Sequence, residues 1–277
     1  MTKRVAGRNI KGTFESYVPM PTLSSFPDRP RADQLAALRA GLAHSNSARS
    51  PAMPFGVSAL DERLASHGLD SAGLHEIAAA SATLSDDAAA TLFTAGIAAR
   101  FAADPQLSIF WALTQFDLYA PGLEQVGLGP NKVFYAQGQK DNIVLAMAED
   151  ALRDGSLACV IAEVRQADQT ATRRLQLAAS DSRTPMLLYR RHRARERCPL
   201  SGLSSAMTRW RIGCLPSARL AHPGVGRARW SIELVRQRNG NPFSLELDAC
   251  DDKGRLALPA AARHRAASAA GADSQAA

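Results

Sequence analysis

Apolar residues in the central part of the chain form two kinds of pattern. Continuous runs of strand length cover residues 107–113, 132–136, 157–164 and 185–189, and an extended segment starts at 73–77. Apolar residues at helical spacing cover 86–102, 141–153 and 170–180. Strands that are apolar on both faces and alternate with helices are typical of a parallel sheet covered by helices. The pattern therefore predicts an α/β fold with a mainly parallel sheet.

Beyond Arg190 the apolar period changes to two. Apolar residues alternate with arginine or polar residues over 208–212, 229–234 and 243–247. Such alternation is typical of strands with one buried face. We expect antiparallel strands that extend one edge of the sheet, with Trp210 and Trp230 facing the core.

The outer parts of the chain show weaker patterns. Residues 1–30 contain four prolines and predict a disordered arm, and 31–54 predict a short helix and a linker. The core with its antiparallel strands is predicted over 55–250, followed by an alanine-rich frayed tail over 251–277. No apolar window reaches the roughly 18 residues of a membrane span, and no secretory signal follows the basic start. We expect a cytoplasmic protein without membrane contact.

The positive charge is concentrated in one region. The whole chain carries a formal net charge of +7, yet residues 190–238 alone hold twelve arginines and two acids. Such a region usually faces a partner of opposite charge, although a solvated strand face with an arginine-rich loop would also explain it. The residues predicted to contact a partner or DNA are Arg190, Arg191, Arg193, Arg195, Arg197, Arg209, Arg211 and Arg229.

Residues that could carry catalysis or bind a metal are sparse. The four cysteines include no CxxC pair, and the His75-Glu76 pair lacks a second histidine four residues on. No GxSxG elbow occurs, and Glu163 at the end of a strand is interpreted as a polar strand end rather than a magnesium ligand. We expect no catalytic residue, no metal and no cofactor.

The turn between the first core strand and the next helix is where an α/β nucleotide-binding protein holds phosphate. The residues there are Ala78, Ala79, Ala80, Ser81, Ala82, Thr83, Leu84, Ser85, Asp86 and Asp87. A phosphate loop needs glycines for converging backbone N–H groups and a lysine for charge, and this stretch has neither. Two aspartates at a helix start suit the helix dipole but repel a triphosphate. The stretch is interpreted as a degenerate P-loop, and no ATPase activity is expected.

The order of motifs resembles a known family. Residues 55–61, 68–69, 73 and 76–77 are similar to the entry of RecA-type ATPase domains. Segments more similar to the ImuA family lie at 110–113, 119–123, 127–128, 152–156, 172–177, 208–212 and 223–230. The most specific are Thr208-Arg-Trp-Arg and the Pro-Gly-x-Gly-x-x-Arg-Trp element that ends at Trp230. The resemblance spans about residues 35–248.

The resemblance implies a function. ImuA proteins are RecA-like accessory factors of SOS-induced translesion synthesis and mutagenesis in the bacterial DNA damage response. It implies an ImuB-like Y-family protein and an error-prone C-family DNA polymerase as partners, with RecA or single-stranded DNA as further candidates. It places Gln115 where the recombinases carry a catalytic glutamate, and a DNA-binding loop between Arg190 and Ser205. The alternatives are a SulA-like inhibitor of cell division and a degenerate DNA-stimulated ATPase.

Overall fold

The computed structural model describes residues 51–104, 106–192, 198–217 and 224–259. The chain divides into two compact units, Met1–Arg49 and Ser50–Ala277, and all described residues belong to the second. The predicted arm over 1–30, and the helix and linker up to residue 50, therefore lie outside the described residues.

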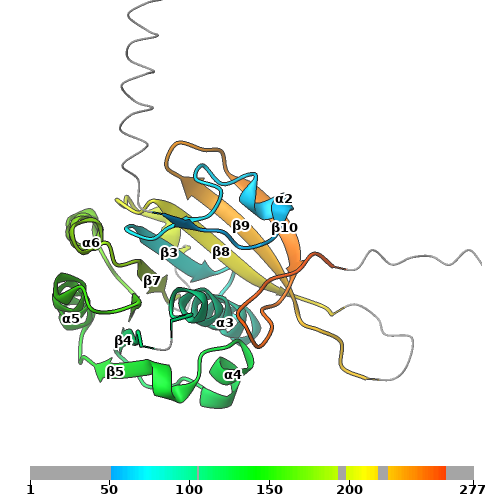
Figure 1. The fold of residues 1–277 in the computed structure, drawn as a ribbon, viewed down its shortest axis with the longest axis horizontal. Helices are drawn as coiled ribbons and strands as arrows, with labels where there is room; N and C mark the ends of the chain where they lie inside the picture. Colours follow the sequence, from blue (N-terminus) through cyan, green and yellow to red (C-terminus); the bar gives the residue numbers. More distant parts are fainter. Residues whose placement is uncertain (1–50, 105, 193–197, 218–223, 260–277) are drawn as a thin grey trace, which may run out of the picture. The chain divides into compact units, whose positions relative to one another are not determined.

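Eight strands form the central sheet (Figure 1). They are β3 (Leu74–Ala79), β4 (Ile109–Leu113), β5 (Val133–Gln137), β6 (Cys159–Val164), β7 (Met186–Arg190), β8 (Thr208–Leu215), β9 (Arg229–Gln237) and β10 (Phe243–Asp248). Their order is β10-β9-β8-β3-β7-β6-β4-β5. Pairs from β8 to β5 are parallel, and β8, β9 and β10 pair antiparallel. The predicted α/β class and the antiparallel strands on the C-terminal side are confirmed.

Helices cover both faces of the parallel part. The main helices are α3 (Leu84–Phe101), α4 (Ala120–Gln125), α5 (Asp141–Asp154) and α6 (Gln169–Ser182). Short elements are β1 (Ala52–Met53), α2 (Ser58–Asp61), β2 (Leu69–Asp70) and the 3-10 turns η1 (Pro130–Lys132) and η2 (Pro199–Ser201). Figure 1 shows α5 and α6 together on one face and α3 on the other. Among the described residues, no helix has the length and apolar character needed to cross a membrane.

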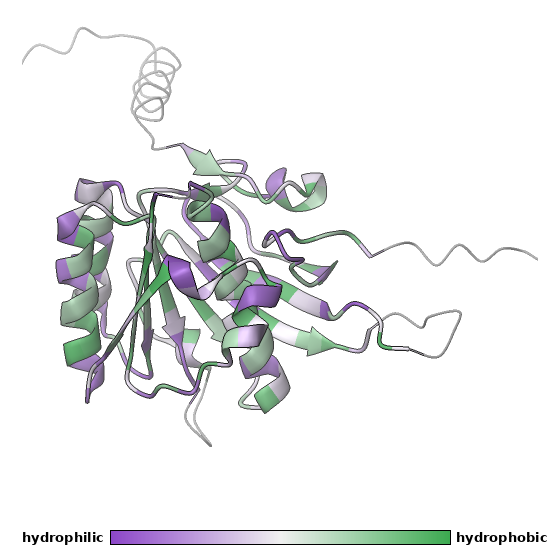
Figure 2. Cartoon of the chain, turned by 60° about the horizontal axis from the view of Figure 1, so that its bottom comes forward, coloured by the Kyte–Doolittle hydropathy of each residue, from purple (hydrophilic) through white to green (hydrophobic). Residues whose placement is uncertain are grey.

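The core has two apolar layers, one on each face of the sheet. The layer under α3 contains the fully buried Phe93 and Trp210 as well as the buried Trp230, so both tryptophans face the core as predicted. The layer under α5 and α6 is built mainly from aliphatic residues such as Val144 and Leu188. In Figure 2 the central strands are coloured hydrophobic, whereas α5 and α6 carry both kinds of residue. This is the arrangement expected for helices with one solvated face.

One local prediction needs correction. Residues 251–259 do not fray: Ala257 pairs with Asp248 at the outer edge of β10, and Leu256 is buried. A β-carbon at Gly254 would clash with the carbonyl oxygen of Gly96 in α3, so this close approach requires glycine at 254. Packing on α3 holds these residues in place, and no pattern in their own sequence predicts that contact.

Candidate functional site: the carboxyl edge of the parallel strands

The predicted degenerate P-loop lies between the end of β3 and the start of α3, and its polar side chains form hydrogen bonds within the protein. The side chain of Thr83 caps α3 by accepting from the Asp86 backbone N–H. The Asp86 carboxylate accepts from the Ser81 hydroxyl at 2.5 Å and from the backbone N–H of Cys214 at 2.7 Å. A carboxylate of the first turn of α3 therefore lies at the positive end of the helix dipole, where it is bound by Ser81 and β8.

Close packing against β8 holds this turn in place. Gly213 of β8 faces the turn, and a β-carbon there would lie 3.1 Å from Ala80 and 3.7 Å from Asp86. The backbone N–H of Ala80 donates to Ile212 at 2.7 Å, which continues the ladder between β3 and β8 past the strand end. A glycine at 213 thus lets the turn approach the sheet closely.

Arg191, one of the predicted contact residues, is held by three carboxylates. Its guanidinium lies 2.6 Å from Glu163 at the end of β6, 2.8 Å from Asp117 after β4, and 3.6 Å from Asp87 of α3. Burial lowers the pKa of Arg191, but its attraction and hydrogen bonds to these acids, Glu163 above all, outweigh burial and raise the pKa. Arg191 therefore stays charged and ties three segments together at this edge.

Two aromatic residues complete the network around Arg191. The indole N–H of Trp111 donates to Glu163 at 2.8 Å, and the hydroxyl of Tyr189 donates to Asp87. Burial raises the pKa of Glu163, and the contacts with Arg191 and Trp111 oppose that rise. Each carboxylate oxygen of Glu163 therefore has a protein partner.

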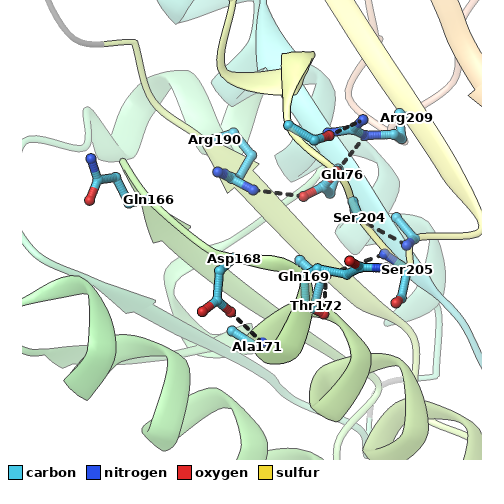
Figure 3. A network of polar contacts seen from close by, with 12 residues as sticks. Glu76, Gln166, Asp168, Gln169, Ala171, Thr172, Arg190, Ser204, Ser205 and Arg209 are labelled. Atoms are coloured by element: carbon cyan, nitrogen blue, oxygen red, sulfur yellow. Dashed lines mark hydrogen bonds and ion pairs between the residues drawn. The ribbon is translucent and has the colours of Figure 1, made fainter.

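Arg190 and Arg209 lie inside the protein, which corrects their assignment to a partner surface. Both pair with Glu76 of β3, Arg190 at 2.8 Å and Arg209 at 2.6 Å (Figure 3). The Glu76 side chain is fully buried, and those of Arg190 and Arg209 are 8% and 7% exposed. A carboxylate inside a strand must find partners, and these arginines come from the neighbouring strands β7 and β8.

The remaining predicted contact residues separate into two groups. Arg211 pairs with Glu233 directly across β8 and β9, and Arg229 pairs with Glu246 of β10 at 2.9 Å. Both pairs are partly exposed, so each contributes about 0.2–1 kcal/mol at most. Arg193, Arg195 and Arg197 lie outside the described residues, and their predicted contact with a partner or DNA stays a prediction.

The family-specific motifs have structural roles. Thr208 is central to the first motif: its hydroxyl accepts from the Trp210 indole at 2.7 Å and donates to His75 Nδ1 at 2.7 Å. The His75 Nε2–H donates to the Asp70 carbonyl at 2.9 Å, and burial lowers the pKa of His75. In the second motif, Arg227 donates to the backbone carbonyls of residues 249 and 255 and braces the C-terminal segment.

The sequence analysis did not predict the ion-pairing roles of two acids, Glu76 and Asp117. Glu76 stands in the otherwise nearly apolar strand β3, and that contrast alone could have predicted a buried partner. Asp117 lies in an irregular segment after β4 and gave no comparable signal. Among the described residues, no group of three or more histidine, cysteine or acidic residues could hold a metal ion.

The fold and this edge define an α/β protein in which two aspartates follow the first strand–helix turn and are bound by other protein groups. Protein ImuA from Caulobacter vibrioides strain NA1000 / CB15N, and its counterpart from strain ATCC 19089 / CIP 103742 / CB 15, are each 31% identical over 205 residues. The match covers 72% of this chain and 84% of each relative. The chain therefore belongs to the ImuA family, the family of damage-induced mutagenesis that its motifs resemble.

Two further comparisons add little. No family model matches the chain. The crystal structure of SulA from Pseudomonas aeruginosa is 18% identical with a TM-score of 0.37, and the match covers 43% of this chain and 98% of that chain. A likeness this distant carries no argument.

Proposed function

We propose that this chain is a non-catalytic accessory protein of SOS-induced translesion DNA synthesis and mutagenesis. It acts in the cytoplasm as an adaptor for an ImuB-like protein and an error-prone C-family DNA polymerase. In this role a RecA-like core serves as a scaffold and turns over no nucleotide. Membership of the ImuA family supports the process, and the carboxyl edge of the sheet supports the absence of catalysis.

The observation that carries the proposal is the pair of aspartates in the first turn of α3. A triphosphate at this turn would meet the carboxylates of Asp86 and Asp87, and Arg191 is already bound by three acids. Two like charges 4 Å apart near a protein surface repel by about 4 kcal/mol, which corresponds to nearly a thousandfold in affinity. Nucleotide affinity at this turn should therefore be very weak.

Equilibrium dialysis of the full chain with radiolabelled ATP and Mg²⁺ tests whether the chain binds nucleotide. The expected result is no saturable binding at micromolar ATP and no phosphate release, with or without single-stranded DNA. Micromolar binding accompanied by turnover would identify a DNA-stimulated ATPase instead.

Co-purification tests the proposed adaptor role. The full chain, expressed with an ImuB-like protein and a C-family polymerase, should retain at least one of them. Because Arg190 and Arg191 are held internally, the matched loss-of-contact variant changes only Arg193, Arg195 and Arg197 to serine. If loss of these three removes no partner, the arginine-rich loop is not the docking element.

A further inference from the structure

The edge of the sheet at β5 exposes aromatic side chains. Among the described residues, the exposed large hydrophobic side chains include four aromatics: Phe116, Tyr119, Phe134 and Tyr135. Phe134 and Tyr135 belong to β5, and the other two follow β4, the strand that pairs with β5. Single exposed apolar residues are ordinary, but a group of aromatics at one edge of a sheet indicates an interaction surface.

These aromatics cover both faces of the edge. Phe134 and Tyr135 point to opposite faces, because successive side chains of a strand alternate. The Tyr135 ring lies 6.2 Å from the ring of Trp111 and meets Phe116 edge to face at 5.1 Å, measured between ring centres. Phe134 pairs in register with Phe110, which packs against the layer under α5 and α6. A strand added to β5 would therefore meet apolar surface on both faces.

The backbone of β5 is also open on its outer side (Figure 1). β5 is the last strand of the sheet, and among the described residues no strand pairs with its outer edge. Gly138, directly after β5, donates its N–H to the Leu113 carbonyl of β4 at 2.9 Å. Because the backbone groups of a strand point alternately to its two sides, the N–H and C=O groups of residues 133, 135 and 137 point outward. Six backbone groups are thus available to a further strand.

The opposite edge of the sheet is protected against such pairing. β10 contains Glu246 and Asp248, and Asp248 pairs with Ala257 of the segment that follows. The sequence of β5, Val-Phe-Tyr-Ala-Gln, contains no charge and no proline. Charges, prolines and covering segments are the usual means by which proteins prevent pairing at an edge. The composition of β5 therefore indicates an edge that pairs with another strand.

We infer that β5 pairs antiparallel with β5 of a second copy of this chain, around a two-fold axis at Tyr135. Tyr135 then lies opposite Tyr135 of the second copy. Phe134 lies opposite Ala136, and residue 133 lies opposite residue 137. The inference goes beyond the proposed accessory role and does not depend on it.

This register suits both the backbone and the side chains. The outward groups of residues 133, 135 and 137 meet those of 137, 135 and 133 in the second copy, so all six on each copy form hydrogen bonds. Phe134 lies opposite the small Ala136 in a pair without backbone hydrogen bonds, where side chains approach most closely, and the small residue leaves room for the ring. No like charges face each other, because β5 has no charge. A two-fold interface requires such self-complementarity.

The exposed aromatic area is sufficient for a weak dimer. The exposed fractions of Phe116, Tyr119, Phe134 and Tyr135 are 56%, 73%, 63% and 37%, which amounts to a little more than two whole side chains in each copy. At about 200 Å² for each aromatic side chain, complete burial in two copies removes about 900 Å² from water. The backbones of the two strands add to this area. The interface therefore reaches the lower limit of specific interfaces, about 1,200 Å².

The charges beside the aromatics disfavour single-stranded nucleic acid at this edge. Surfaces that stack bases on aromatics also carry cations for the phosphates. Here three carboxylates surround the single cation Arg191, and burial together with the nearby Glu163 raises the pKa of Tyr135. This excess of negative charge repels a phosphate backbone. In the two-fold pair the carboxyl ends of the two strands lie at opposite ends of the interface, so these acids stay apart.

Analytical ultracentrifugation of the full chain from about 1 to 200 µM tests the inference. The unchanged chain should change reversibly from one copy to two as the concentration rises. Phe134→Lys places a charge in the interface twice and should weaken association about a hundredfold, or about tenfold for each copy. The matched control is Leu177→Lys, which changes a side chain on α6 that is also more than half exposed and should leave association unchanged. Thermal unfolding checks that both variants fold.

Cysteine cross-linking tests the register. In the inferred pair the Cα atoms of the two Tyr135 residues are about 5.5 Å apart, which a disulfide can bridge. The two Phe134 residues lie on a diagonal at about 7–8 Å, which is too far. Under mild oxidation Tyr135→Cys should form a covalent dimer, and Phe134→Cys should form little. Both variants also carry Cys214→Ser, because Cys214 is exposed.

Three results would overturn the inference. One is a single copy at every concentration; if Phe134→Lys then also prevents co-purification of the ImuB-like protein, the edge binds that partner instead. Another is association that Phe134→Lys leaves unchanged or that Leu177→Lys weakens equally. The third is equal cross-linking of the two cysteine variants, which would show that the strands do not pair in this register. None of these results affects the ATP dialysis, so the two proposals fail separately.

Discussion

Replacing Glu76 with glutamine removes the one negative charge in the buried cluster and preserves the size of the side chain. Glu76 is fully buried and accepts from Arg190 at 2.8 Å and from Arg209 at 2.6 Å, one arginine on each carboxylate oxygen. In the variant, two buried guanidiniums face a neutral amide, and one arginine meets the amide NH₂, which is a donor. The variant should therefore lose much more stability than loss of a surface ion pair would cause.

The expected magnitude follows from the burial of all three side chains. Removing one partner of a buried ion pair typically costs about 3–5 kcal/mol, because the remaining charge stays buried without compensation. For a domain of this size, each kcal/mol lowers Tm by roughly 2–4 °C. Glu76→Gln should therefore lower Tm by roughly 6–20 °C.

Urea unfolding followed by tryptophan fluorescence gives the free energy of unfolding, with Glu233→Gln as the matched control. Glu233 makes the same kind of pair with Arg211, but both side chains are about one-third exposed, so the control should lose only about 0.2–1 kcal/mol. Equal losses in the two variants, or a loss below about 1 kcal/mol for Glu76→Gln, would refute the reasoning that burial makes this carboxylate essential.

Two further predictions concern the edge network and the C-terminal segment. Arg191→Met should cost roughly 3 kcal/mol at pH 8, because Glu163 is left buried without its cation. Burial already raises the pKa of Glu163, and loss of Arg191 raises it further, so stability is lost as the pH rises through that pKa. The deficit should therefore shrink at pH 5, and a deficit that grows on acidification would contradict this sign. Gly254→Ala places a β-carbon on the Gly96 carbonyl at φ +68 and should cost about 1–3 kcal/mol in urea unfolding. Gly202→Ala, with open space around it, should change stability by less than about 0.5 kcal/mol; similar losses in both would show that the Gly254 contact is unimportant.

Most of the elements could be predicted from local patterns. The helix predicted over 141–153 is α5 at Asp141–Asp154, and the strand predicted over 157–164 is β6 at Cys159–Val164. The alternating pattern correctly predicted that Trp210 and Trp230 are buried. These predictions succeed because burial imposes a period on each element that depends only on its own residues.

The contacts within the candidate site could not be predicted from local patterns in the same way. The lack of glycine and lysine over 78–87 was visible in the sequence, but the hydrogen bond from Cys214 to Asp86 joins residues 128 positions apart. The assignment of Arg190 and Arg209 to a partner surface was wrong, because a count of charge does not say which arginines have an internal acid. Alternation placed Arg209 on the polar face of its strand, whereas Arg190 directly follows a continuous apolar run; both pair with the buried Glu76.

The sequence by itself determined the fold class, the family and the chemistry that the first strand–helix turn lacks, since these depend on residue types and their spacing along the chain. Only the tertiary structure decided which arginines are buried and which acids hold them. Ion pairs here join strands that are neighbours in the sheet but up to 133 residues apart in the chain, and no local pattern encodes that adjacency.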